Sequence, residues 1–210
     1  LGFEALLRWQ HPKQGLLTPD LFLPLAEKTG LIIPIGNWVI NEACRQLREW
    51  HLQGRQSWSM AVNLSTLQFE QPSLVNTVLN CLALHHVPPE MLILEVTETT
   101  AMSNPDESVR VLTELTEAGV KASIDDFGTG YASYARLKSV DADILKIDGG
   151  FIRNIVSNSL DYQIVASMCH LARMKKMLVV AEYVETEEIR SAVLALGIDY
   201  VQGYLIGLPV

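Results

Sequence analysis

Short runs of apolar residues alternate along the whole chain with longer segments whose apolar residues recur at helical spacing. The short runs have the length of β-strands and cover residues 2–9, 58–64, 91–97, 120–125, 144–148, 177–182 and 198–202. The helical patterns between them cover residues 37–53, 73–85, 106–118, 161–175 and 187–196. In the first of these, the apolar stripe consists of Val39, Ile40, Ala43, Cys44, Leu47 and Trp50. This alternation predicts parallel strands joined by right-handed helical crossovers.

The predicted fold class is α/β, a (β/α)₈ barrel of the TIM type. Glycines stand where three helices should end, at Gly54, Gly119 and Gly197, and Pro105 marks a helix start. Seven strands are visible and a closed barrel has eight, so we expect that the first strand is missing from this chain, truncated at its N-terminus. No linker or repeat interrupts residues 1–210, which predicts a single domain.

An open, doubly wound sheet is the alternative architecture. That fold predicts a glycine-rich phosphate loop after the first strand. Residues 8–12 read Arg-Trp-Gln-His-Pro, which is not such a loop.

Composition narrows the classes of partner and compartment. The 210 residues are 49% hydrophobic and carry a formal net charge of −8. This balance argues against a general binder of nucleic-acid polymers, so a phosphate ligand would need divalent cations to attract it. No run reaches the roughly 18 apolar residues of a membrane span, and no signal peptide opens the chain. Three cysteines without motif spacing indicate buried thiols. We therefore expect a cytoplasmic domain without membrane contact, which is compatible with a membrane-anchored parent protein.

Polar side chains stand at or near the end of every predicted strand. They are Glu4, Arg8, Asn63, Glu95, Glu98, Asp125, Asp126, Lys146, Asp148, Glu182, Glu185 and Gln202. One acidic residue at a strand end is usually a helix cap or a solvated loop residue, but seven such ends favour one site, because barrel active sites lie at this rim. Clustered carboxylates repel one another without cations, and oxygen ligands select Mg²⁺ or Mn²⁺. The adjacent Asp125 and Asp126 suggest two metals that share a ligand.

Two short motifs after the fourth strand are weaker signals. Asp126-Phe127-Gly128 matches the metal triad of protein kinases, but no His-Arg-Asp loop accompanies it. Gly128-Thr129-Gly130 is a fragment of a dinucleotide fingerprint without the third glycine. We interpret residues 127–131 as a mobile loop over the site, with an ordinary strand-to-helix turn as the alternative.

Glu4-Ala5-Leu6-Leu7-Arg8-Trp9 resembles the signature of the EAL family of cyclic-di-GMP phosphodiesterases. The resemblance extends over nearly the whole chain. Further matching motifs are Asn63-Leu64-Ser65, Glu95-Val96-Thr97-Glu98, Asp125-Asp126-Phe127-Gly128-Thr129-Gly130-Tyr131, Lys146-Ile147-Asp148, Glu182-Tyr183-Val184-Glu185-Thr186 and Gln202-Gly203-Tyr204. Each motif alone is unspecific, and their common order is specific.

The resemblance implies a metal-dependent phosphodiesterase that hydrolyses cyclic-di-GMP to linear pGpG in bacterial signalling, with two Mg²⁺ or Mn²⁺ ions and a homodimer. It implies metal ligands at Glu4, Asn63, Glu95, Asp125, Asp126 and Glu182, with Asp125 as a bridge. It implies catalytic roles for Lys146, Asp126 and Glu182, and substrate contacts from Leu6, Arg8 and Gln202. It further implies that Glu98, Glu185 and Asp148 support the loop at residues 127–131.

The chain departs from the family pattern at two places. Tyr183 stands where the family has glycine, and tyrosine would be strained there if the position needs a positive φ. Ala132-Ser133 replaces the usual serine pattern.

Three rival functions stay open. One is a degenerate barrel that binds cyclic-di-GMP without cleaving it, although such proteins normally lose metal ligands and all six are present here. The second is a protein-interaction domain without ligand, against which Arg8 and Gln202 argue. The third is a barrel glycosidase with two carboxylates, which does not explain Asn63 or Lys146.

Overall fold

The computed structural model describes residues 2–129 and 140–209, which form two compact units. The first unit comprises Leu1–Val96 and Thr113–Lys121, and the second comprises Thr97–Leu112 and Ala122–Val210. Parallel strands alternate with helices in both units, so the predicted α/β alternation is confirmed. All seven expected strands are present, most of them a few residues shorter than the apolar runs. The single domain expected from the sequence stays a prediction.

Three parallel strands form the sheet of the first unit. They are β1 (Gly2–Ala5), β4 (Ser59–Asn63) and β5 (Leu92–Thr97), with β4 between the other two. Glu4 pairs with Ala61 in the first ladder, and Asn63 pairs with Glu95 in the second. Apolar residues of β4 and β5 are buried, among them Val62 and Leu94.

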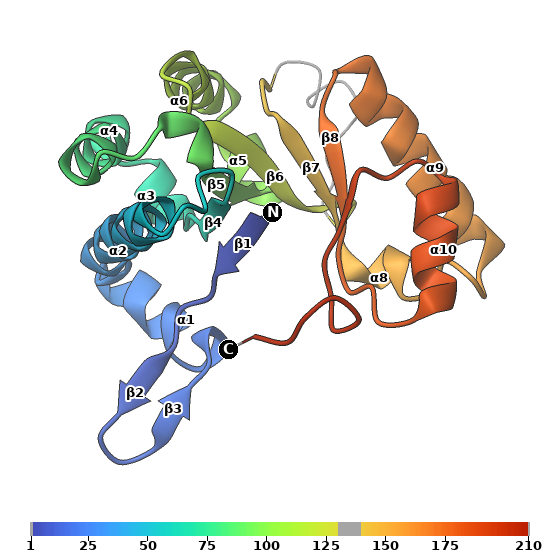
Figure 1. Ribbon diagram of the computed structural model, residues 1–210, viewed down its shortest axis with the longest axis horizontal. Helices are drawn as coiled ribbons and strands as arrows, with labels where there is room; N and C mark the ends of the chain where they lie inside the picture. The colour runs from blue at the N-terminus through green and yellow to red at the C-terminus, as the bar shows by residue number, and fades with distance from the viewer. Residues whose placement is uncertain (1, 130–139, 210) are drawn as a thin grey trace. The chain divides into compact units, whose positions relative to one another are not determined.

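The helices of the first unit are α1 (Pro19–Thr29), α2 (Ile32–Leu52), α3 (Thr66–Phe69), α4 (Leu74–His85) and the 3₁₀ turn Pro89–Met91. Helix α2 packs beside α4 (Figure 1). Its buried stripe contains Ile40, Ala43, Cys44 and Leu47, as the helical spacing predicted. The helix begins at Ile32, five residues before the predicted start at Asn37. Pro34 does not interrupt it, because the first N–H groups of a helix have no acceptor within the helix.

The first apolar run was wrongly expected to be one strand as far as Trp9. Strand β1 ends at Ala5, and Trp9 begins a separate antiparallel hairpin of β2 (Trp9–His11) and β3 (Gly15–Leu17). The Nδ1 atom of His11 accepts hydrogen bonds from the backbone N–H groups of Lys13 and Gln14 at 3.2 and 3.1 Å. Apolar periodicity could not reveal this break, because side chains on both sides of it are apolar.

Four parallel strands form the sheet of the second unit, in the order β6 (Lys121–Phe127), β7 (Ile144–Ile147), β8 (Leu178–Ala181) and β9 (Tyr200–Val201). Its helices are α5 (Glu98–Ser103), α8 (Gly149–Ile152), α9 (Ser159–Met174) and α10 (Glu187–Ala195), and α6 (Pro105–Glu117) begins in this unit and ends in the first. Helix α9 packs against β7 and β8 (Figure 1), and this contact buries Val165, Cys169 and Val179.

The predicted helix ends are confirmed at Gly54, Gly119 and Gly197, which have φ values of 87°, 91° and 69°. Pro105 is the first residue of α6, also as predicted. None of the helices within residues 2–129 and 140–209 combines the length and the hydropathy that crossing a bilayer requires. Gly130, Tyr131, Ala132 and Ser133, to which the sequence assigned part of a loop and its variation, lie outside the described residues.

Candidate active site

Three charged side chains meet at the carboxyl ends of β6, β7 and β8 in the second unit. The Nζ atom of Lys146 lies 3.3 Å from Oδ1 of Asp125 and 3.0 Å from Oε1 of Glu182. All three residues are buried, and Lys146 is only 2% exposed. Charged groups that are taken out of water must be paired, because desolvation costs several kcal/mol per ion. The lysine therefore holds two carboxylates side by side.

Asp126 adds a third carboxylate. Single oxygen atoms of Asp125, Asp126 and Glu182 all lie within 4.8 Å of one another. Consecutive residues of a regular strand point to opposite faces, so two adjacent aspartates should not converge. Here the pairing of β6 with β7 shifts register between Ile124 and Phe127, and Asp126 has a φ of 53°. This bulge brings both aspartates to the same site.

The group of Asp125, Asp126, Lys146 and Glu182, called the acidic cluster below, fits a divalent cation. Three carboxylates and one ammonium leave an excess of negative charge. Carboxylate oxygens are hard ligands of the type that Mg²⁺ and Mn²⁺ prefer. The cluster thus has the ligand chemistry that the sequence predicted for a metal site.

The first unit assembles the other predicted ligands at the ends of its own strands. Nδ2 of Asn63 donates a hydrogen bond to Oε1 of Glu4 at 2.6 Å. Asn63 pairs with Glu95 in the ladder of β4 and β5, and Glu95 is only 4% exposed. Asn63 is the last residue of β4, and Glu4 and Glu95 lie on the two strands that flank it, near their carboxyl ends.

A pocket of about 260 Å³ in the first unit contains two of the predicted substrate contacts, Leu6 and Arg8, in its wall. Trp38 and Glu42 of α2 also line it. Hydrogen bonds from Arg45 lower the pKa of Glu42, so this carboxyl is ionised at neutral pH. The lining of the pocket thus includes an aromatic ring from Trp38, a cation from Arg8 and an anion from Glu42.

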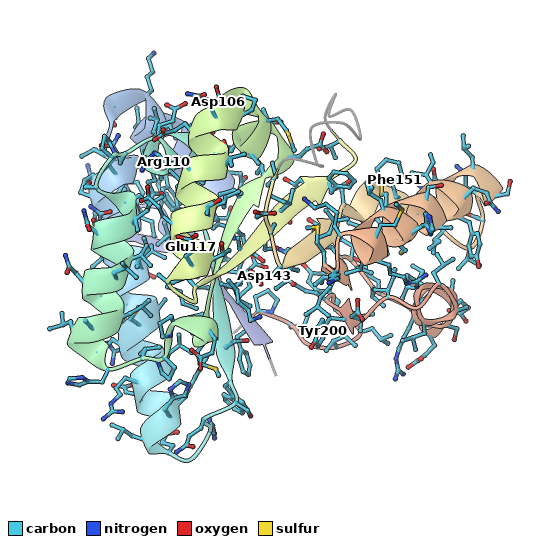
Figure 2. All side chains as sticks on the ribbon, turned by 90° about the horizontal axis from the view of Figure 1, so that it is seen from above. Asp106, Arg110, Glu117, Asp143, Phe151 and Tyr200 are labelled. Carbon is cyan, nitrogen blue, oxygen red and sulfur yellow. The ribbon has the colours of Figure 1, made fainter. Side chains whose placement is uncertain are left out.

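The residues expected to support the loop after β6 have different surroundings. Oε2 of Glu98 accepts a hydrogen bond from the backbone N–H of Gly128 at 2.7 Å, and Glu98 is 2% exposed. Asp148 caps α8, where its Oδ1 accepts the N–H of Gly150 at 2.8 Å. Glu185 is exposed. Gly128 itself must be small, because an added Cβ would lie 2.6 Å from the ring of Phe151. Figure 2 labels Phe151.

Gln202, the remaining predicted substrate contact, holds the turn that carries Glu182. Its carbonyl oxygen accepts the N–H of Val184 at 2.9 Å. The next residue, Gly203, lies so close that an added Cβ would be 2.4 Å from the Val184 backbone. The turn between Glu182 and Val184 is therefore fixed by main-chain contacts.

Tyr183 occupies the centre of this turn with a φ of 52°. The sequence predicted strain at this tyrosine if its φ is positive, and the φ is positive. A left-handed conformation costs a non-glycine residue about 1–2 kcal/mol. The ring of Tyr183 lies under the guanidinium of Arg153, whose Cζ is 3.8 Å from the ring centroid. Sequence reasoning singled out neither Arg153 nor Gly149, which lies four residues before it. The signal in the sequence that could have pointed to this contact is the pair of glycines, Gly149 and Gly150, after Asp148.

Comparison with known proteins identifies the family of this chain. The family model described as the EAL domain matches residues 1–209. The chain is 52% identical over 209 residues to the bifunctional diguanylate cyclase/cyclic di-GMP phosphodiesterase MucR of Pseudomonas aeruginosa. It is 55% identical over 206 residues to the cyclic di-GMP phosphodiesterase PdeF of Escherichia coli. These matches cover 100% and 98% of this chain, which spans 30% and 27% of the length of the two relatives.

Among solved structures, a PaMucR phosphodiesterase in complex with c-di-GMP is 52% identical and superposes with a TM-score of 0.95. The match covers 100% of this chain and 85% of that one. The likeness confirms the α/β fold of the TIM-like barrel class and excludes the doubly wound alternative. On the agreement of sequence and fold, the chain belongs to the EAL domain family.

Proposed function

We propose that this domain is a phosphodiesterase that hydrolyses cyclic di-GMP to linear pGpG with the help of Mg²⁺ or Mn²⁺. The acidic cluster carries the proposal, because Lys146 stands between two buried carboxylates at distances of 3.0 and 3.3 Å. Support comes from relatives named as cyclic di-GMP phosphodiesterases at 52% and 55% identity over nearly the whole chain. The proposal also places the domain in the cytoplasm, as a homodimer.

Asp125, Asp126 and Glu182 would hold the metal in the second unit, and Glu4, Asn63 and Glu95 are assigned to the same reaction by the family resemblance. A bound divalent cation lowers the pKa of water and neutralises charge on phosphoryl oxygens. Lys146 donates N–H groups and so can orient the attacking water or a phosphate oxygen. We assign substrate contacts to Arg8 and Leu6, which line the pocket of the first unit, and to Gln202.

The test is incubation of the purified domain with cyclic di-GMP and Mg²⁺ or Mn²⁺, with products separated by chromatography. We expect pGpG as the main product, its loss in excess chelator, and poor turnover with Ca²⁺, which prefers longer bonds and more ligands. Tight binding of cyclic di-GMP without any product would instead show a receptor. Full activity in excess chelator would contradict the metal assignment, and size-exclusion chromatography with light scattering tests the homodimer.

A further inference from the structure

The ring of Tyr183 fills a space that exists because residue 149 has no side chain. A Cβ added to Gly149 would lie 2.1 Å from Cδ2 and 2.6 Å from Cγ of that ring. Real Cβ atoms do not approach other atoms so closely, so Gly149 and Tyr183 are sterically matched. Gly149 is buried, whereas Tyr183 is 45% exposed, so the ring covers the glycine from the solvent side.

Arg153 completes the contact from the same face of α8. The backbone N–H of Arg153 donates to the carbonyl oxygen of Gly149 at 2.9 Å, which places the two residues one helical turn apart. The guanidinium lies over the Tyr183 ring at 3.8 Å from its centroid, which is cation–π geometry. The Tyr183 ring therefore contacts α8 at two points, the backbone of Gly149 and the guanidinium of Arg153.

This contact lies directly beside the acidic cluster. Helix α8 begins two residues after the last residue of β7, the strand that carries Lys146. Tyr183 follows Glu182, and the backbone N–H of Glu182 donates to the carbonyl oxygen of Ile147 at 3.4 Å. Lys146, the residue before Ile147, forms an ion pair of 3.0 Å with Glu182, the residue before Tyr183. The Tyr183 contact thus joins the two segments that directly follow the partners of that pair.

We infer that Gly149, Tyr183 and Arg153 form a clasp that positions Glu182 in the acidic cluster. The clasp holds a tyrosine at a backbone conformation that would otherwise favour glycine, and the smallness of residue 149 is the condition for it. Tyr183 is a positioning residue in this scheme, because it acts through Glu182. The inference rests on the metal site of the proposed function.

A double-mutant cycle tests the clasp, with Mn²⁺ affinity of the metal-free protein measured by calorimetry. Gly149→Ala should weaken Mn²⁺ binding by at least about tenfold, because its methyl group displaces the ring and with it the Glu182 turn. Tyr183→Gly removes the obstruction and the strain together, so it should change Mn²⁺ affinity, like turnover, by less than about tenfold. In the double variant, Gly149→Ala should cost less than about threefold relative to Tyr183→Gly alone.

Two further variants serve as controls. Gly207→Ala should leave Mn²⁺ affinity unchanged, because no heavy atom lies within 4 Å of the added Cβ and no positive φ opposes it. Arg153→Ala should weaken Mn²⁺ binding, and Arg153→Lys should restore most of the loss, because an ammonium also binds over an aromatic face. Equal effects of Gly149→Ala and Gly207→Ala, or no recovery in the double variant, would overturn the clasp.

Thermal unfolding of the same metal-free variants separates this inference from the proposed function. Coupling between positions 149 and 183 in unfolding, with unchanged Mn²⁺ affinity, would reduce the contact to packing and refute the positioning role. If the unchanged protein bound no Mn²⁺ at all, the metal site would be wrong, and the unfolding cycle would still decide whether Gly149 and Tyr183 are matched. Absence of coupling in unfolding would refute the match itself.

Discussion

Acidic side chains stand at both ends of the strands in the second unit, in two different settings. At the carboxyl ends, Asp125 and Glu182 contact the ammonium of Lys146, and Asp126 adds a third carboxylate within 4.8 Å. At the amino ends, Oδ2 of Asp143 accepts the backbone N–H of Ala122 at 2.9 Å, and Oδ2 of Asp199 accepts that of Val179 at 2.8 Å. Asp143 precedes β7 and Asp199 precedes β9; Figure 2 labels Asp143 and Tyr200, the residue after Asp199.

The two settings show how a structural aspartate differs from one available for chemistry. The strand-start aspartates, Asp143 and Asp199, each satisfy a backbone donor of a neighbouring strand, and the backbone N–H of each donates back to that strand. In the acidic cluster, carboxylates crowd together around one lysine, an arrangement that a divalent cation would relieve. Substitutions at the two ends should therefore change different properties: turnover at one end and stability at the other.

The largest effect is expected for Asp125→Ala. Removal of this carboxylate takes a ligand from the acidic cluster, so kcat should fall by at least about a thousandfold, roughly 4 kcal/mol of barrier. The melting temperature should stay close to that of the unchanged domain, because repulsion within the cluster also decreases. Steady-state kinetics and thermal unfolding on one preparation check both parts. Turnover near the original rate would remove Asp125 from the chemistry.

Lys146→Ala comes next. Loss of a group that orients or helps to deprotonate water typically costs 10²- to 10⁴-fold, so kcat should fall by about that factor. Binding of cyclic di-GMP, measured by calorimetry with Ca²⁺, should persist. Lys175→Ala is the matched control, since Lys175 also contacts a carboxylate and a carbonyl oxygen, those of Asp141 and Val140, outside the acidic cluster. Normal substrate binding together with most of the original kcat would show that Lys146 only balances charge.

Asp143→Ala should lower stability and leave kcat nearly unchanged. Ala122 is fully buried, so its N–H would lose its acceptor at a cost of about 1–3 kcal/mol. For a chain of this size, the melting temperature should fall by about 2–4 °C for each kcal/mol. Asp143→Asn keeps an acceptor oxygen and should recover most of the loss. A drop in kcat without a change in melting temperature would contradict the structural role.

The smallest effect is expected for Asp199→Ala. Its partner Val179 is buried, but Asp199 itself is exposed, so water can reach the freed N–H more easily than at Asp143. The loss of melting temperature should therefore be smaller than for Asp143→Ala, again with little change in kcat. An equal or larger loss would show that exposure of the acceptor does not govern its contribution.

Local sequence determined the order of the seven parallel strands and of the five longer helices α2, α4, α6, α9 and α10, and the residues near the strand ends. Strand and helix periods are properties of a few neighbouring residues, which is why all seven strands and the caps at Gly54, Gly119 and Gly197 could be predicted. Where one apolar run contained a break, as between Ala5 and Trp9, the period carried no signal and the hairpin was missed. The strand-end positions of the predicted ligands followed from the same local periods.

Only the tertiary structure decided how those residues meet. The bulge at Asp126, the bridging position of Lys146 and the space for the Tyr183 ring over Gly149 all depend on neighbouring strands and helices. The same holds for Asp143, which sequence reasoning did not single out and whose acceptor role requires a donor 21 residues away. Contacts between residues far apart in the chain arise from packing, and a single sequence records which side chains are present but not which atoms become neighbours.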